Sequence, residues 1–270
     1  MFWNAENKCI SIGDTTMNYV SFGKGKNILI MLPGLGDGLT TVQGMAIPMA
    51  VAYQIYAGDC KVYIFSRKNH LKASASTRDM ARDQAEAMNA LGIKKANVLG
   101  ISQGGMIAQY LAIDYPDIVQ KLVLAVTLSK QNELVQNVVS DWISMAEQKD
   151  YKSLIIDTAE KSYSEKYLKK YRLLYPIFGR VGKPKNFDRF LIQAKSCMHH
   201  NAYSELDKIL CPTLVIGGAC DKIVGVNGSI ELADKIKRCE LFIYDEFGHA
   251  AYEEAKDFHN RVLSFLSKQE

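Results

Sequence analysis

A serine set between glycines is the first feature of this chain that could do chemistry. The stretch Gly100-Ile101-Ser102-Gln103-Gly104 follows an apolar run and precedes a helix-like segment. Small residues on either side of Ser102 let a strand and a helix approach closely, and a strained turn would hold the hydroxyl out where it can react. The N-terminus of the helix would lie under that hydroxyl, so the backbone amide of Gln103 can stabilise a developing oxyanion.

A serine hydroxyl is a poor nucleophile without a base, and His249 is the histidine best placed to act as one. The chain has five histidines, and His249 stands after the last predicted strand and before the last predicted helix, in "YDEFGHAAYEE". That position lies at the carboxyl edge of a parallel sheet, where the sites of α/β proteins form. His259 falls within the last predicted helix and is expected at the surface.

The base needs an acid to orient it, and the sequence predicts Asp221 for this role. Asp221 stands in "TLVIGGACDKIVG", just after a buried apolar run and between Ser102 and His249 in chain order. Asp245 and Glu246 are so close to His249 in sequence that they are not the first choice. The three predicted catalytic residues are therefore Ser102, Asp221 and His249.

A glycine-rich turn supplies a candidate for the second oxyanion donor. The segment "MLPGLGDG" follows the third predicted strand, on the same edge of the sheet as the serine. Such a turn would bring a backbone N–H close to the hydroxyl, and Leu35 is the predicted donor, paired with Gln103. A simple loop is the alternative, because the glycines permit either.

These residues need a sheet to position them, and short apolar, β-branched runs recur along the chain. Runs such as "ILIML" and "KLVLAV" are almost continuous, which is typical of strands covered by helices on both faces of a mainly parallel sheet. The first two runs flank a short polar turn and predict a hairpin at the sheet edge. The fold class predicted is α/β, with a mostly parallel eight-stranded sheet flanked by helices. The predicted strands are 9–12, 17–22, 27–32, 61–65, 97–100, 122–126, 213–216 and 240–244.

One long stretch departs from the alternation of strand and helix. Residues 130–210 carry helical patterns but no convincing strand, and an inserted helical lid explains this best. The predicted core is then 1–129 together with 211–270. Elsewhere a helix is predicted to begin at the Ser/Thr–Asp cap of "STRDMARDQAEAMNALGI" and to stop at Gly92, and another covers 250–266.

The charge of the chain is small overall but uneven. The net charge is +4, which gives no reason to expect nucleic-acid binding. Residues 151–195 hold 11 basic and 4 acidic side chains, a net +7. Such a stripe could attract an anionic substrate or an acidic carrier protein, or it could be a solvated helical face.

The six cysteines are scattered, without C-x-x-C spacing and without a pair of histidines at metal-ligand distance. Free thiols in a reducing cytoplasm are the simplest account, and no metal site is expected. The N-terminal residues do not have the pattern of a secretory signal, and no apolar run is long enough to insert into a membrane. The sequence therefore predicts a cytoplasmic protein.

Taken together, "LPGLG", "GISQGG", "GGACDKIV" and "FGHAAY" resemble the α/β-hydrolase superfamily over nearly the whole chain. The chain is similar to the lid-bearing, esterase-like branch, which includes enol-lactonases, C–C bond hydrolases, thioesterases and proline iminopeptidases. The resemblance implies a catalytic triad of Ser102, Asp221 and His249, an oxyanion hole of the Leu35 and Gln103 amides, and no cofactor. Pro33 is a departure, because many relatives have a histidine there.

The activity expected is that of a serine hydrolase of the carboxylesterase type, cleaving a small carboxylic ester through an acyl-enzyme on Ser102. A C–C bond hydrolase, an enol-lactonase, a thioesterase or an acyltransferase would use the same residues, and these alternatives stay open. A ligand-binding receptor of the same fold that turns over little or nothing is an alternative of another class.

Overall fold

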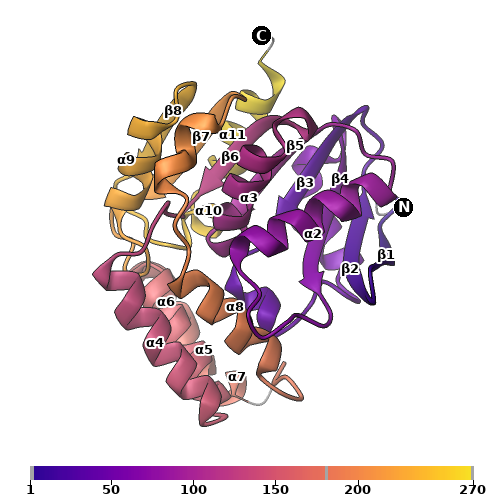
Figure 1. Ribbon diagram of the computed structural model, residues 1–270. Helices are drawn as coiled ribbons and strands as arrows, with labels where there is room; N and C mark the ends of the chain where they lie inside the picture. The colour runs from indigo at the N-terminus through magenta and orange to yellow at the C-terminus, as the bar shows by residue number, and fades with distance from the viewer. Residues whose placement is uncertain (1–2, 180–181, 269–270) are drawn as a thin grey trace.

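An eight-stranded sheet forms the centre of the molecule (Figure 1). The computed structural model describes residues 3–179 and 182–268. The strands run in the order β1-β2-β4-β3-β5-β6-β7-β8 across the sheet. All eight predicted strands are confirmed, and most of them extend beyond the predicted bounds. They are β1 (Glu6–Ile12), β2 (Thr15–Phe22), β3 (Asn27–Leu32), β4 (Cys60–Lys68), β5 (Ala96–Ile101), β6 (Val119–Ala125), β7 (Thr213–Gly218) and β8 (Cys239–Tyr244).

The sheet is mostly parallel, as predicted. Strands β4, β3, β5, β6, β7 and β8 pair in parallel, while β2 pairs antiparallel with both β1 and β4. The β1–β2 hairpin lies at the edge, which confirms that prediction. Strand β5 lies between β3 and β6, so the residue that follows it emerges at the middle of the carboxyl edge.

Helices cover both faces of the sheet. On one face, α2 and α3 pack with Met80, Met88, Ile107 and Leu111 buried, and α9 joins them. On the other face, α1, α10 and α11 bury residues that include Phe258. The helices are α1 (Ala46–Ala52), α2 (Thr77–Ala90), α3 (Gln103–Asp114), α4 (Glu133–Glu147), α5 (Tyr151–Ser162), α6 (Glu165–Tyr171), α7 (Tyr175–Phe178), α8 (Asp188–Met198), α9 (Val226–Lys235), α10 (Ala251–Glu254) and α11 (Phe258–Ser267), with short 3₁₀ turns η1 (Leu35–Gly38), η2 (Gln54–Tyr56), η3 (Pro116–Ile118), η4 (Arg172–Leu174) and η5 (Tyr203–Lys208).

Local signals fix the ends of α2. Ser76 caps the helix by accepting from the Asp79 amide, and the Asp79 side chain accepts from Ser76 in return. Gly92, just past the C-cap, has a φ of +71°, which is the left-handed conformation that closes a helix and favours glycine. The predicted beginning at the Ser/Thr–Asp cap and stop at Gly92 are confirmed.

Two predicted boundaries were wrong. The 250–266 helix is two helices, because Ala255 adopts an extended conformation after α10 and Asp257 then begins α11. This break buries both Ala255 and Phe258 against the sheet. The strand predicted to reach residue 126 ends at Ala125, because Val126 has a φ of +45° and leaves the extended conformation.

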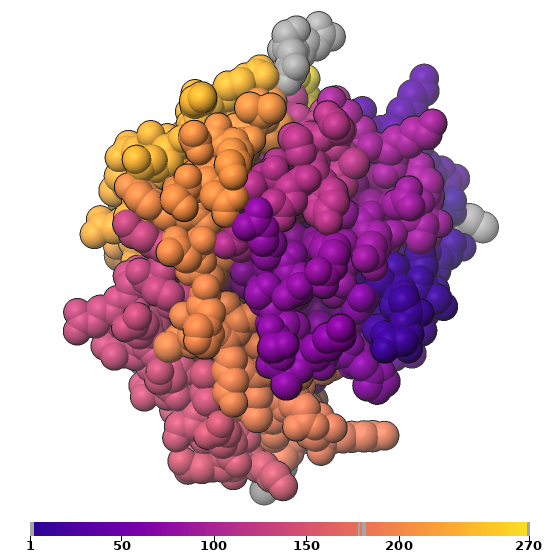
Figure 2. Space-filling view, in the orientation of Figure 1, coloured from indigo at the N-terminus to yellow at the C-terminus, as the bar shows by residue number. Residues whose placement is uncertain are grey.

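Helices α4 to α8 connect β6 to β7 and lie together at one end of the molecule (Figure 1). In Figure 2 this segment, coloured rose to salmon, forms the lower end of the face shown. The residues between α8 and β7, which include η5, pack into the core beside α3 and α9 through Ala202, Leu206 and Ile209. None of the helices in the described ranges has the length and apolar character needed to cross a membrane. All six cysteines are free thiols.

Candidate active site

Ser102 lies in a strained turn between β5 and α3. Its φ of 53° and ψ of −119° are unfavourable for a residue with a side chain, and the surrounding packing enforces them. A Cβ placed on Gly104 would lie 1.9 Å from the Leu32 carbonyl oxygen, and one on Gly100 would lie 2.5 Å from the Gly104 carbonyl oxygen. Only glycine therefore allows α3 to approach β3 and β5 this closely, which the pentapeptide pattern predicted.

A second strained residue supports the turn from the neighbouring strand. Val126 has a left-handed φ of 45°, which is rare for a β-branched residue, and its amide donates to the Ile216 carbonyl. The turn aims Thr127 at the serine, and the Thr127 hydroxyl donates to the Ser102 carbonyl oxygen at 2.8 Å. The backbone of the serine is thus held from β6 as well as from β5.

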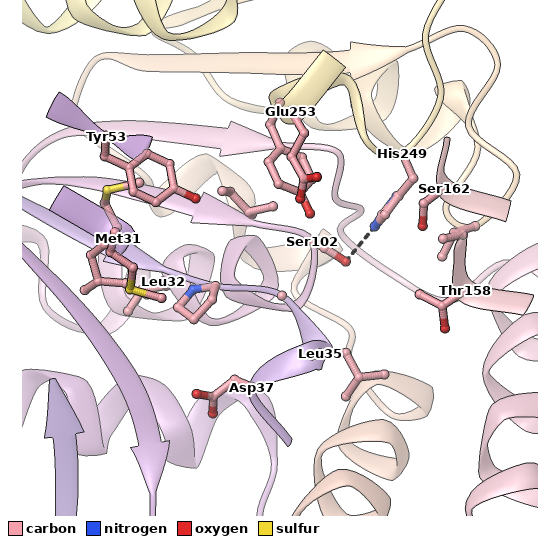
Figure 3. Close-up of a pocket in the computed structure, with 18 of the residues that line it drawn as sticks. Met31, Leu32, Leu35, Asp37, Tyr53, Ser102, Thr158, Ser162, His249 and Glu253 are labelled. Atoms are coloured by element: carbon pink, nitrogen blue, oxygen red, sulfur yellow. Dashed lines mark hydrogen bonds between the residues drawn. The ribbon is translucent and has the colours of Figure 1, made fainter. Parts of the chain in front are cut away.

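The three predicted catalytic side chains meet at the carboxyl edge of the sheet. His249 Nε2 lies 2.9 Å from Ser102 Oγ, the contact drawn as a dashed line in Figure 3, and His249 Nδ1 lies 2.8 Å from Asp221 Oδ2. The three residues follow β5, β7 and β8; strands β7 and β8 are neighbours, and β6 separates β7 from β5. This geometry allows the histidine to take the serine proton while the aspartate orients the ring.

Asp221 is held as a buried carboxylate. Its Oδ1 accepts from the amides of Ile223 at 2.8 Å and Val224 at 3.0 Å, while Oδ2 faces His249. Burial alone would raise the pKa of Asp221, but His249 and the two amides outweigh burial and hold the pKa below its ordinary value. The acid therefore stays ionised and can stabilise a protonated histidine.

The glycine-rich turn after β3 lies directly against the serine. A Cβ on Gly34 would be only 3.4 Å from the Cβ of Ser102. Leu35 begins η1 and Gln103 begins α3, and the first amides of a helix have no acceptor within the helix. Among the described residues neither amide has a backbone acceptor elsewhere. The structure brings both predicted donors to the turn that holds Ser102.

A buried polar network, not predicted from the sequence, fixes this turn. The Arg67 guanidinium donates to the Pro33 carbonyl at 2.6 Å and to Gln103 Oε1 at 3.2 Å. Asp37 Oδ2 accepts from the Arg67 amide at 3.0 Å and forms an ion pair with Arg189 of α8 at 2.9 Å. Burial lowers the pKa of Arg67, and the nearby Asp37 carboxylate opposes that shift.

The Gln103 side chain belongs to the same network and turns away from the reaction. Its amide nitrogen donates to the Gln193 carbonyl of α8 at 2.8 Å. The residue is 1% exposed, so its side chain is not available to a substrate. Gln103 can therefore act in the reaction only through its backbone amide, as a donor to an oxyanion formed at Ser102. Its side chain links α8 to Arg67 and the glycine-rich turn.

The helical segment makes a second attachment at the histidine loop. The Ala250 amide donates to the Ser162 carbonyl at 2.9 Å, directly after His249. The Ser164 amide and hydroxyl both donate to Glu254 of α10, and Tyr163 donates to Glu253. The segment between β6 and β7 therefore contacts both sides of the serine, through α8 at the glycine-rich turn and through α5 and α6 at the histidine.

A cavity of about 340 Å³ opens onto Ser102 and His249. Met31 and Ile64 line it from the sheet, and Met49 and Tyr53 line it from α1 and the end of that helix. Figure 3 shows Met31 and Tyr53 together on one side of the cavity. Trp142, Thr158 and Ser162 line it from the helical segment, and Tyr252 and Glu253 line it from α10. No lysine or arginine is among the lining side chains in the described part of the chain. The cavity has the size and apolar character of a small-molecule site.

The other histidines lie away from this cavity. Buried His200 bonds to Thr77, and burial lowers its pKa to about 3. His259 was expected at the surface, and this was wrong: its ring is half-buried and bonds to the Tyr56 hydroxyl at 2.9 Å. Burial lowers the pKa of His259 to about 4. In the described ranges, no group of three or more His, Cys, Asp or Glu residues is arranged to hold a metal ion.

Comparison with known proteins decides the family. A family model described as the alpha/beta hydrolase fold matches residues 27–256. The chain belongs to this family. The resemblance to the α/β-hydrolase superfamily is thereby confirmed, and the protein is an α/β hydrolase.

Relatives of this hydrolase include enzymes of more than one activity. A 2-hydroxy-6-oxononadienedioate/2-hydroxy-6-oxononatrienedioate hydrolase of Klebsiella pneumoniae subsp. pneumoniae is 27% identical over 259 residues, 91% of this chain and 89% of that protein. The enol-lactonase of Burkholderia xenovorans LB400 has a TM-score of 0.83 at 19% identity, covering 97% of this chain and 100% of that one. An esterase of Exiguobacterium antarcticum has a TM-score of 0.78 at 17% identity, with 97% and 100% covered. The two structural likenesses show the fold only.

Proposed function

We propose that this hydrolase cleaves carboxylic esters without a negative charge on the substrate, through an acyl-enzyme on Ser102. The observation that carries the proposal is the continuous contact from Asp221 through His249 to Ser102 at the floor of an apolar cavity. A serine activated in this way attacks carbonyl carbon, and apolar walls favour an apolar acyl or alcohol group.

In the proposed mechanism, His249 takes the Ser102 proton as the serine oxygen forms a bond to the ester carbonyl carbon. The carbonyl oxygen becomes an oxyanion, which the Leu35 and Gln103 amides stabilise. The intermediate collapses, the C–O bond to the alcohol breaks, and His249 returns the proton to the departing oxygen. A water molecule then attacks the acyl carbon with His249 as base, which releases the acid and restores Ser102.

The segment of residues 130–210 is proposed to act as the lid of this site. Trp142, Thr158 and Ser162 line the cavity. The ion pair of Arg189 with Asp37 holds α8 against the glycine-rich turn at residues 33–38, which contains Leu35 and is called the oxyanion turn below. The basic stripe within 151–195 sends none of its described lysines or arginines into the cavity wall, so an anionic substrate finds no support there. Binding of an acidic carrier protein to that stripe stays a prediction.

Cleavage of a C–C bond is the second candidate, and the named activity of the Klebsiella relative favours it. A dienedioate carries two carboxylates, however, and no basic side chain of the described ranges lines this cavity. Of its two lining carboxylates, Asp37 is enclosed and ion-paired with Arg189, so it is Glu253 that would face the dianion. Binding a dianion without a cation leaves both negative charges uncompensated. Ester cleavage is therefore the activity that the charge of the cavity supports best.

The test is a panel of neutral esters of graded acyl length beside 2-hydroxy-6-oxononadienedioate, assayed with the wild type and with Ser102→Ala. The proposal expects neutral esters to be turned over and the dienedioate to be turned over at least 100-fold more slowly. Loss of the nucleophile should lower ester turnover by roughly 10⁴-fold or more. Efficient cleavage of the dienedioate, or ester turnover retained by Ser102→Ala, would overturn the proposal. Ser140→Ala, on the exposed face of α4, is the matched control.

A further inference from the structure

We propose that Glu253 forms a cation-binding subsite in the cavity, so that the preferred esters carry an ammonium group. This inference rests on the proposed ester hydrolysis and specifies its substrate class. Glu253 lines the same cavity as Ser102 and His249, and it follows His249 by four residues on α10. Figure 3 shows Glu253 in the cavity wall, between Tyr53 and His249.

The Glu253 side chain is exposed, and one hydrogen bond orients its carboxylate. The Tyr163 hydroxyl donates to Oε2 at 2.5 Å, across the contact between α10 and the junction of α5 and α6. Tyr252, next to Glu253 on α10, and Tyr53, at the end of α1, also line the cavity. Burial raises the pKa of Tyr53 to about 12 and the Glu253 charge adds to that shift, which is consistent with a carboxylate close to the tyrosine ring.

The charge of Glu253 is also uncompensated, which separates it from the neighbouring acids. Asp37, the other carboxylate of the cavity wall, forms an ion pair with Arg189. Glu254, the next residue of α10, accepts from both the amide and the hydroxyl of Ser164. Glu253 has the Tyr163 hydroxyl but no lysine or arginine partner among the described residues. The cavity therefore has one free negative charge beside aromatic rings.

That combination fits an ammonium group and rejects an anion. An ammonium is attracted by a carboxylate and by aromatic rings, and Tyr53 and Tyr252 line the same cavity as Glu253. A substrate carboxylate in the same position would be repelled by Glu253 and would find no lysine or arginine among the described lining residues. The ammonium could belong to the alcohol, as in a choline-type ester, or to the acyl group, as in an amino-acyl ester.

The experiment compares esters that differ in charge but not in shape. Butyrylcholine is paired with its neutral isostere 3,3-dimethylbutyl butyrate for a charge on the alcohol. For a charge on the acyl group, an ethyl 4-aminobutyrate is paired with ethyl valerate, and monoethyl succinate supplies the anion. The wild type is expected to show a kcat/KM for one cationic ester about tenfold above that of its neutral partner, and the lowest value for the anion.

Glu253→Gln keeps the shape of the side chain and removes its charge. The ratio of kcat/KM for the cationic over the neutral ester should fall to about 1 in this variant. Glu246→Gln makes the same change of net charge at an exposed position outside the cavity wall, and its ratio should stay at the wild-type value. If the ratio falls for the butyrylcholine pair, the alcohol half of the ester lies beside α10. If it falls for the 4-aminobutyrate pair, the acyl half lies there.

Two outcomes separate this inference from the proposed function. If no ester is turned over in a Ser102-dependent way, the proposed function fails and the inference fails with it. If neutral esters are turned over through Ser102 but no cationic ester is preferred, or the preference survives in Glu253→Gln, the proposed function stands and the cation subsite is overturned.

Discussion

Ser102 lies between two buried aspartates that serve different partners. Asp221 follows β7 and binds a side chain, the imidazole of His249. Asp37 lies in η1 after β3, and it holds the Arg67 amide and the Arg189 guanidinium beside the turn that contains Leu35. Both aspartate side chains are fully enclosed, at 1% and 0% exposure. The two aspartates position different groups. Asp221 orients the His249 imidazole, which carries the proton, whereas Asp37 and Arg67 hold the backbone of the oxyanion turn.

The comparison indicates how the two halves of the site depend on the rest of the molecule. The Asp221 carboxylate itself is bonded only to His249 and to amides of its own loop. The helical segment contacts this half elsewhere, where Ala250 donates to the Ser162 carbonyl and Asn132 donates to the Val224 carbonyl. The Asp37 side reaches the helical segment, because Arg189 and Gln193 belong to α8. We therefore expect a shift of α8 to displace the oxyanion turn more than it displaces the hydrogen-bonded side chains of Ser102, His249 and Asp221.

The largest effect that tests this comparison is expected from Asp221→Asn. The variant keeps the shape of the acid but favours the wrong histidine tautomer, so kcat should fall by roughly 10⁴-fold while the fold is retained. Steady-state kinetics and circular dichroism measure the two. Asp245→Asn is the control, since this exposed aspartate is closer to His249 in sequence but is not bonded to its ring. A large loss in Asp245→Asn with little loss in Asp221→Asn would reverse the assignment.

A smaller effect, about 10²-fold in kcat, is expected from Arg67→Met, because the Pro33 carbonyl and Gln103 side chain lose their donor and the turn loses its position. Arg67 acts here as a positioning residue. KM should change little, and the affinity for a boronic acid that mimics the tetrahedral intermediate should fall in parallel with kcat. A purely structural role would lower the unfolding free energy without changing the boronic acid affinity of the folded fraction. Arg67→Lys restores charge without the two-pronged geometry and should recover only part of kcat.

The smallest expected effect is the change of the free energy of unfolding with pH, which depends on the buried or half-buried histidines His200 and His259. The pKa of His200 is about 3 and that of His259 about 4 in the folded protein, below the ordinary value of 6.5. The unfolded chain thus binds more protons between pH 6.5 and 4, so stability is full above pH 6.5 and is lost as the pH falls. The lowered pKa of Asp221 adds a loss only below pH 4, as this carboxylate protonates.

Urea unfolding at several pH values tests these windows. Replacing His200 with Gln should remove part of the slope between pH 6.5 and 4, by up to about 1.4 kcal/mol per pH unit for one proton. Asp221→Asn should leave the slope in that window unchanged, because its own titration lies lower. A wild-type slope of zero between pH 6.5 and 4, or one that Asp221→Asn removes, would contradict the assignment of that window to the buried histidines.

The two aspartates also differ in how far the sequence predicted them. Asp221 could be predicted because it follows a buried strand and stands between a serine and a histidine, each with its own local signal. Asp37 and Arg67 carry no such pattern, and their partner Arg189 is more than 100 residues away in the chain. A charged residue at the carboxyl end of an otherwise buried strand, as Arg67 is in β4, was the available signal. What remained unpredictable is the pairing across elements, which depends on tertiary structure.

The same distinction holds for the fold. The eight strands and the hairpin could be predicted because continuous apolar runs and a polar turn are local patterns. The break between α10 and α11 could not, since it depends on burying Ala255 and Phe258 together against the sheet. Likewise His259 is predicted at the surface of its helix, and only the tertiary structure shows that it is half-buried and bonded to Tyr56.

The most direct test of the central claim, that the relay of Asp221 and His249 activates Ser102, is covalent labelling with a fluorophosphonate followed by peptide mass spectrometry. The wild type is expected to gain one adduct, on the peptide that contains Ser102. Labelling of His249→Ala should be at least about 100-fold slower, because general-base assistance contributes roughly 10²- to 10⁴-fold. An adduct on a different residue, or equal labelling rates in the wild type and His249→Ala, would contradict the account.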